Sequence, residues 1–141
     1  MAIFQKLLPL LAISVISLPN AQANTDKIAT PLLDNCKQQQ TQATAYSICL
    51  DEAVKQVERE LESWILQTEN KISASASGPQ VDAAMYELKR ANKYYQQYIE
   101  SYCRSLFFAN QGSAEAANIF RQCKIVQIRQ RITLLKYEKD K

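Results

Sequence analysis

The chain has 141 residues and a formal net charge of +3, with 17 lysines and arginines, 14 acidic residues and no histidine. The missing imidazole excludes the serine and cysteine triads that use histidine as their base, and it removes the commonest zinc ligand. The near balance of charge excludes a strongly basic nucleic-acid binder, so no nucleic-acid partner is expected. Only carboxylate or lysine chemistry remains open to an enzyme.

Residues 1–23 have the pattern of a secretory signal peptide. Lys6 precedes an apolar core over Leu7–Leu18, and Ala21-Gln22-Ala23 supplies the small residues of a cleavage site. This core of about 12 residues is shorter than the roughly 20 residues of a transmembrane helix, and no later segment comes closer. We therefore expect a periplasmic or secreted protein without a membrane span, consisting of one domain over residues 24–141.

The cysteine count predicts two disulfides. Four cysteines follow the expected cleavage site: Cys36, Cys49, Cys103 and Cys123. An even number of cysteines in an exported chain is typical of disulfides, and the absence of both histidine and a CxxC pair argues against a metal site or another cofactor. Four cysteines allow three pairings. We predict Cys36 with Cys49 and Cys103 with Cys123, because one pair then lies at each end of the chain.

The first predicted elements are an arm over residues 24–35, which holds Pro31, and a long helix over residues 44–72. Apolar positions in the helix recur at intervals of three, four and seven residues, which places them on one helical stripe. This stripe consists of Tyr46, Leu50, Val54, Val57, Leu61, Trp64, Ile65, Thr68 and Ile72. The small residues, glycine and proline of Ser73–Pro79 then predict a loop in which the chain reverses direction.

A second helix is predicted over residues 80–107 and a third over residues 114–138, separated by a turn at Ala109–Ser113. One side of the second helix is apolar: Val81, Met85, Leu88, Ala91, Tyr95, Ile99, Tyr102 and Leu106. The third helix carries two apolar stripes. They are Ile125, Ile128, Ile132 and Leu135, and Ile119, Cys123, Val126, Leu134 and Tyr137. A helix that is apolar on two sides is usually packed between two neighbours.

These elements predict an all-α protein, a monomeric up-down-up three-helix bundle with an N-terminal arm, in which short connections make consecutive helices antiparallel. The first and third helices have opposite charge. Residues 113–141 carry seven basic and three acidic residues, whereas residues 44–72 carry three basic and six acidic residues. We expect these helices to attract one another, or the bundle to have one acidic and one basic face.

Three segments carry a characteristic spacing of cysteines, polar residues and leucines. They are Cys36, Thr41-Gln42, Cys49, Glu58 and Leu61; Leu88, Asn92, Tyr95, Glu100 and Cys103; and Cys123, Arg131 and Leu135. This spacing resembles the LprI-like lysozyme-inhibitor domain, a family of small cysteine-bearing helical modules in exported bacterial proteins. The chain departs from the family pattern at Glu62, Ile99 and Ile128, where the family has asparagine, arginine and threonine. The resemblance implies a secreted or periplasmic binding protein, with inhibition of lysozyme as the associated activity.

Four acidic residues of the first helix form the sharpest candidate for a contact with a partner: Asp51, Glu58, Glu62 and Glu69. Their spacing of seven, four and seven residues places them on one stripe, about 100° around the helix from the apolar stripe. Such an acidic stripe could steer a basic glycosidase and occupy its sugar cleft. The alternative is a solvated flank that faces Arg129 and Arg131 of the third helix.

Two further groups of residues, paired carboxylates and clustered tyrosines, are expected to have a structural role and not a catalytic or binding role. Paired carboxylates such as Glu58 and Glu62 act as a general acid only in a sheltered cleft, and a narrow bundle offers no obvious cleft, so we expect a protein that is not an enzyme. Four tyrosines cluster in the second helix: Tyr94, Tyr95, Tyr98 and Tyr102. We expect them to belong to the core of the bundle, with hydroxyl groups that reach the surface.

Two functions remain. The first is a binding protein that inhibits a peptidoglycan-cleaving hydrolase of lysozyme type, and the second is a non-inhibitory interaction module that stabilises an envelope assembly. Both need only a rigid exported scaffold with a recognition face.

Overall fold

The computed structural model describes residues 26–39, 41–75 and 77–139, which form four helices and no strand. In chain order the helices are α1 (Asp26–Lys37), α2 (Ala43–Ser75), α3 (Pro79–Ala109) and α4 (Ala116–Lys139). The predicted all-α class is therefore confirmed. The predicted signal peptide, residues 1–23, lies outside the described residues.

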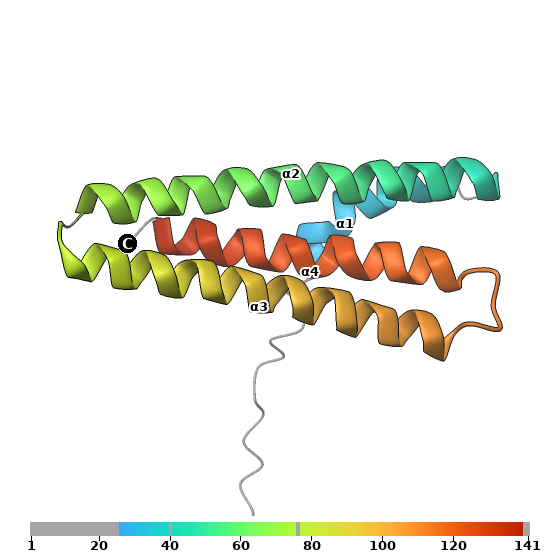
Figure 1. Cartoon of the computed structure of the whole chain (residues 1–141). Coiled ribbons are helices and arrows are strands. Elements are labelled where there is room, and N and C mark those ends of the chain that lie inside the picture. The colour runs from blue at the N-terminus through green and yellow to red at the C-terminus, as the bar shows by residue number, and fades with distance from the viewer. Residues whose placement is uncertain (1–25, 40, 76, 140–141) are drawn as a thin grey trace, which may run out of the picture.

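The helix α4 lies between α2 and α3, as Figure 1 shows, and it packs more extensively against each of them than they pack against each other. The chain reverses direction between α2 and α3 and again between α3 and α4, so α2 and α4 are parallel (Figure 1). This is the predicted order of the three long helices. The predicted position of α4 between two neighbours is therefore confirmed, although only the first of its two predicted apolar stripes is buried throughout.

The predicted N-terminal arm is largely a fourth helix, which corrects the prediction of three helices. Pro31 lies inside α1, where its ring removes one backbone hydrogen bond. Tertiary contacts compensate, because Leu32 and Leu33 pack against the core and Cys36 is buried in it. α1 packs on both α2 and α4. A short helix of this kind depends on such packing more than on its own helix propensity. The sequence of residues 24–35 alone therefore does not predict a helix.

The connection between α2 and α3 is shorter than predicted. Ser73 and Ser75 belong to α2, and their hydroxyl groups donate hydrogen bonds to the backbone carbonyls of Glu69 (3.0 Å) and Lys71 (2.6 Å) within the helix. This bonding to the preceding turn is compatible with helical backbone. The break falls instead at Gly78, whose φ of 82° is favourable only for glycine, and Pro79 then begins α3.

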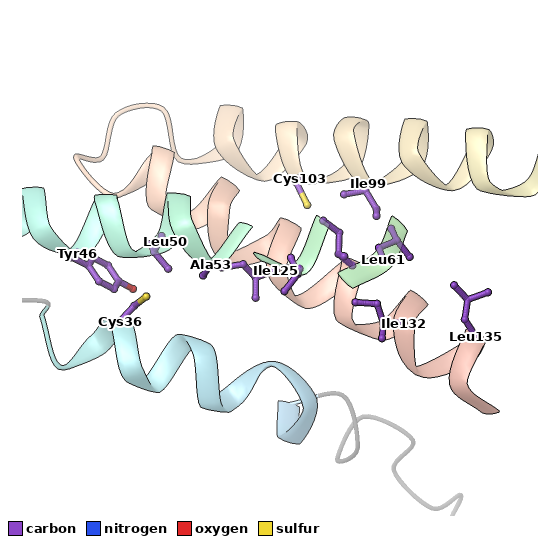
Figure 2. Close-up of a cluster of buried hydrophobic side chains, with 12 residues drawn as sticks. Cys36, Tyr46, Leu50, Ala53, Leu61, Ile99, Cys103, Ile125, Ile132 and Leu135 are labelled. Carbon is purple, nitrogen blue, oxygen red and sulfur yellow. The ribbon is translucent and has the colours of Figure 1, made fainter. Parts of the chain in front are cut away.

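The core is formed by side chains from all four helices, which converge along α4 (Figure 2). Its largest fully buried side chains are Leu50, Ile125, Ile132, Leu135, Val57, Cys36 and Cys103. The first predicted stripe of α4 is buried throughout, whereas Leu134 and Tyr137 of the second stripe are 52% and 61% exposed. α3 contributes only Ile99 and Cys103 to the buried set, so most of its surface faces away from the core.

Both predicted disulfides are present. Cys36 is bonded to Cys49 and Cys103 to Cys123, with Cα–Cα distances of 5.5 Å in each pair. The first disulfide joins α1 to α2, and the second joins α3 to α4 near the 110–115 turn. The four-helix arrangement is therefore covalently fixed at two interfaces.

The two disulfides should have different effects when removed. Cys103→Ala with Cys123→Ala opens a loop with a sequence separation of 20 and should lower the free energy of unfolding of the whole bundle. The expected loss is about 3 kcal/mol in the chain-entropy model, measured by urea denaturation. Cys36→Ala with Cys49→Ala should in addition release α1 locally, so amide exchange should rise in α1 before it rises in the three long helices. Equal exchange rates in α1 with and without this disulfide would contradict the expectation.

Candidate functional site

The acidic stripe of α2 is partly neutralised by α4. Asp51 accepts a hydrogen bond from Arg121 Nε at 2.7 Å, and Glu58 accepts one from Lys124 Nζ at 2.8 Å. Glu62 is exposed and makes no ion pair with a described residue. Glu69 is half-buried farther along α2. The four candidate residues therefore lie on one helix, but they differ in ion pairing and in exposure to solvent.

A second set of ion pairs lies beside the stripe. Glu60, which is not part of the stripe, pairs with Arg129 at 2.6 Å and with Lys136 at 3.2 Å. The expected attraction between the two oppositely charged helices is confirmed by these contacts. The stripe does face α4, but its partners there are Arg121 and Lys124 and not Arg129 and Arg131. Arg129 pairs with Glu60, and Arg131 donates a hydrogen bond to Asn92 of α3 at 3.0 Å.

The surface between α2 and α3 is hollowed into a groove of about 380 Å³. Its residues come from three helices: Glu58, Leu61, Glu62 and Ile65 of α2, Gln96, Ile99 and Glu100 of α3, and Lys124 and Ile128 of α4. Leu61, Ile99 and Ile128 make the base apolar because they are buried core residues. Glu58 and Glu62 thus lie on the rim of a groove, an arrangement that the sequence analysis did not anticipate.

A second hollow of about 260 Å³ lies beside the first. It is lined by Asp51, Val54, Phe107, Ala117, Phe120, Arg121 and Lys124. Lys124 lines both hollows, so they are adjacent along α4. We refer to the two together as the α2–α3 groove. Two of the four acidic candidates line its larger part, Asp51 lines its smaller part, and Glu69 lines neither.

The carboxylates outnumber the cations along this groove. The acidic residues are Asp51, Glu58, Glu62 and Glu100, and the basic ones are Arg121 and Lys124. Glu100 also pairs with Arg104, which is an exposed neighbour on α3. Three of the four carboxylates are thus paired with cations, and the groove has an excess of one negative charge, at Glu62. Among the described residues no cluster of histidine, cysteine, aspartate or glutamate could hold a metal ion.

Three of the four clustered tyrosines are exposed, which corrects the expectation that they belong to the core. Tyr94, Tyr98 and Tyr102 are 57%, 50% and 41% exposed, and the rings of Tyr98 and Tyr102 are nearly parallel with centroids 5.7 Å apart. Only Tyr95 packs against the core. The four-residue spacing of Tyr94, Tyr98 and Tyr102 places them on one side of α3, and this spacing was the available signal for a shared exposed face.

Many of the residues that carry the family resemblance make contacts that join one helix to another. Tyr95 donates a hydrogen bond from its hydroxyl to the carbonyl of Gln127 at 2.6 Å, and the Arg131 guanidinium lies 5.6 Å from the centre of its ring. Arg131 also binds Asn92, so three residues of the pattern join α3 to α4. The four cysteines form the disulfides, and Leu61 and Leu135 are buried. The shared spacing thus describes how the helices are held together.

No family model matches the chain, and neither the curated proteins nor the solved structures include a significant match. The resemblance to the LprI-like domain therefore rests on the residues quoted above. None of the described helices is long and apolar enough to cross a membrane.

Tyr95 provides a test of the contact between α3 and α4. Burial raises the pKa of its phenol above the ordinary value of 10.0, although the nearby Arg131 opposes this effect. A raised pKa in the folded state means that the contribution to stability is complete below about pH 10, and is lost as the pH rises from there through the folded-state pKa.

Tyr95→Phe should lower the free energy of unfolding by about 1 kcal/mol at pH 8, because the hydrogen bond to Gln127 is lost. Above pH 10 the difference between the two proteins should shrink, since phenylalanine cannot ionise in the unfolded chain. Urea denaturation at several values between pH 8 and pH 11 measures both effects. A difference that stays constant over this range would show that Tyr95 is not desolvated.

Proposed function

We propose that this chain is an exported binding protein that inhibits a peptidoglycan-cleaving hydrolase of lysozyme type. Export is supported by the signal-like residues 1–23 and by two disulfides, which persist in oxidising compartments. The similarity to the LprI-like domain supports the class of partner. The chain would act as a monomer in the periplasm or outside the cell, without a cofactor and without catalysis of its own.

The observation that carries the proposal is the acidic groove between α2 and α3. A groove with excess carboxylates would attract a basic hydrolase and orient it during the encounter. Glu62 contributes most directly to an external field, because its carboxylate is exposed and makes no ion pair with a described residue. Inhibition would follow if the bound protein covered the sugar cleft of the enzyme.

The charge of Glu62 should affect inhibition without affecting the fold. Glu62→Lys should raise the inhibition constant by about tenfold at low salt, because a cation would then face a basic partner. The effect should diminish at higher ionic strength, where exposed charges are screened over about 10 Å or less. Clearing of cell-wall suspensions by several lysozyme types provides the measurement. Glu58 is a poorer choice, since its replacement would leave Lys124 without its partner.

Glu52→Lys is the matched control. Glu52 is an exposed acid of the same helix that pairs with Lys55 and does not line the groove, so this variant makes the same change in net charge. It should alter inhibition much less than Glu62→Lys does. Equal effects of the two variants would remove the groove from the proposal, and failure of the unaltered protein to inhibit any lysozyme type would overturn inhibition as the function.

The exposed tyrosines support a second candidate, a non-inhibitory module that stabilises an envelope assembly. Tyr94, Tyr98 and Tyr102 present large amphipathic side chains on the outer side of α3. Tyrosine is enriched at the centres of protein interfaces because it offers a large contact area at a low entropic cost. A protein recovered from envelope extract by the unaltered chain, but not by Tyr98→Ala, would favour this function.

A further inference from the structure

The α2–α3 groove is long as well as apolar at its base. Along α2 its lining extends from Asp51 to Ile65, which corresponds to about 21 Å of helix. Lys124, which pairs with Glu58 of α2, lines both hollows, and their volumes are about 380 and 260 Å³. The groove therefore suits a row of side chains from an elongated ligand that lies along it.

The surroundings of the groove favour a helical ligand over an extended peptide. All of its walls are α-helices, whose backbone groups are paired within each helix. An extended segment would find no strand edge in the described residues, so its own backbone amides would remain unpaired against an apolar surface. A helix satisfies its backbone internally and offers one apolar face, which is the usual mode of recognition in a groove between helices.

The charges of the rim determine which helix would fit. Carboxylates stand on both walls, with Glu58 and Glu62 on α2 and Glu100 on α3. Glu58 is paired with Lys124 and Glu100 with the exposed Arg104, whereas Glu62 makes no ion pair with a described residue. Apolar side chains lie between them at the base, including Ile99 and Ile128. A complementary helix would have one apolar face flanked on both sides by lysine or arginine.

We propose that the α2–α3 groove binds a basic amphipathic helix of the partner protein. Its apolar side chains would lie on Leu61, Ile99 and Ile128, and its cations would pair with Glu62 and Glu100 on opposite walls. The identity of the partner as a hydrolase rests on the proposed function, whereas the capacity of the groove for such a helix does not.

The experiment uses the chain from residue 24 onward and a labelled peptide of about 16 residues, about 24 Å long as a helix. Leucines recur in the peptide every three or four residues, and lysines flank them. Binding is measured by fluorescence anisotropy, and the binding surface is located by NMR chemical-shift changes. One control peptide has the same composition in an order that destroys the apolar face, and a second has glutamate in place of lysine. Both controls should bind at least about tenfold more weakly.

A pair of neighbouring glutamines provides matched variants of the protein. Gln96 and Gln97 are both exposed residues of α3, but only Gln96 lines the groove. Gln96→Trp should fill the groove and raise the dissociation constant by about tenfold or more, whereas Gln97→Trp should change it by less than about twofold. Glu62→Lys should also weaken binding, and its effect should shrink with added salt. Circular dichroism confirms that each variant is folded.

Several results would overturn the inference. They are no binding of the lysine peptide, equal binding of the glutamate peptide, and equal effects of Gln96→Trp and Gln97→Trp. Loss of binding in Tyr98→Ala, with Gln96→Trp unaffected, would place the ligand on the tyrosines instead. Inhibition of a hydrolase is assayed separately. Inhibition that persists in Gln96→Trp would reject the groove and keep the function, whereas groove binding without any inhibition would keep the groove and reject the function.

Discussion

The position of α4 between α2 and α3 is the constraint on which the rest of the structure depends. Four aliphatic residues of α4 are almost completely buried: Ile125, Ile128, Ile132 and Leu135. Burying four such side chains contributes about 6 to 12 kcal/mol before the entropy of ordering the chain is subtracted. Because α4 occupies the space between its neighbours, α2 and α3 meet near their connection and separate toward their other ends (Figure 1). The groove is a direct consequence of this separation.

The ion pairs between α2 and α4 fix how these two parallel helices are aligned. Cations of α4 alternate along the interface with acids of α2, and the contact of Arg129 with Glu60 is the most sheltered, with side chains 16% and 28% exposed. Exposed pairs of this kind contribute about 1 kcal/mol or less, so hydrophobic burial remains the larger source of stability. They also favour this register, because a displaced α4 would separate its cations from their acidic partners on α2.

Helical periodicity in the sequence was sufficient to predict the three long helices and the buried stripe of α4. Periodicity was insufficient where residues that usually interrupt a helix, such as proline and serine, lie in a segment that packing holds as a helix. Pro31 suggested an arm, but packing of Leu32, Leu33 and Cys36 holds this segment as a helix. Ser73 and Ser75 suggested a loop, although serine hydroxyls can bond within a helix. The tyrosines were assigned to the core on their residue type, whereas the geometry of α3 decides which of them face α4.

The acidic stripe was predictable as a stripe but not as the rim of a groove. Spacing along one helix determines which residues share a face, and it contains no information on how far away the next helix lies. Gln96 and Glu100 belong to the candidate site because α3 forms the wall of the groove opposite α2. Lys124 joined it because α4 lies beneath both helices. A site built from three helices requires their relative positions, which depend on packing between residues that are distant in sequence.

The residues that hold the fold together are largely distinct from those that could recognise a partner. The disulfides and the contacts among Asn92, Tyr95 and Arg131 hold the helices together, and they include many of the residues that carry the resemblance to the LprI-like domain. Glu58 and Glu100 of that pattern line the groove. Glu62 and Gln96 line the groove and take part in none of these contacts. Substitutions at such exposed positions usually change stability by no more than about 0.5 kcal/mol. The same scaffold can therefore present different groove surfaces, so similarity in the scaffold residues supports a common fold more strongly than a common partner.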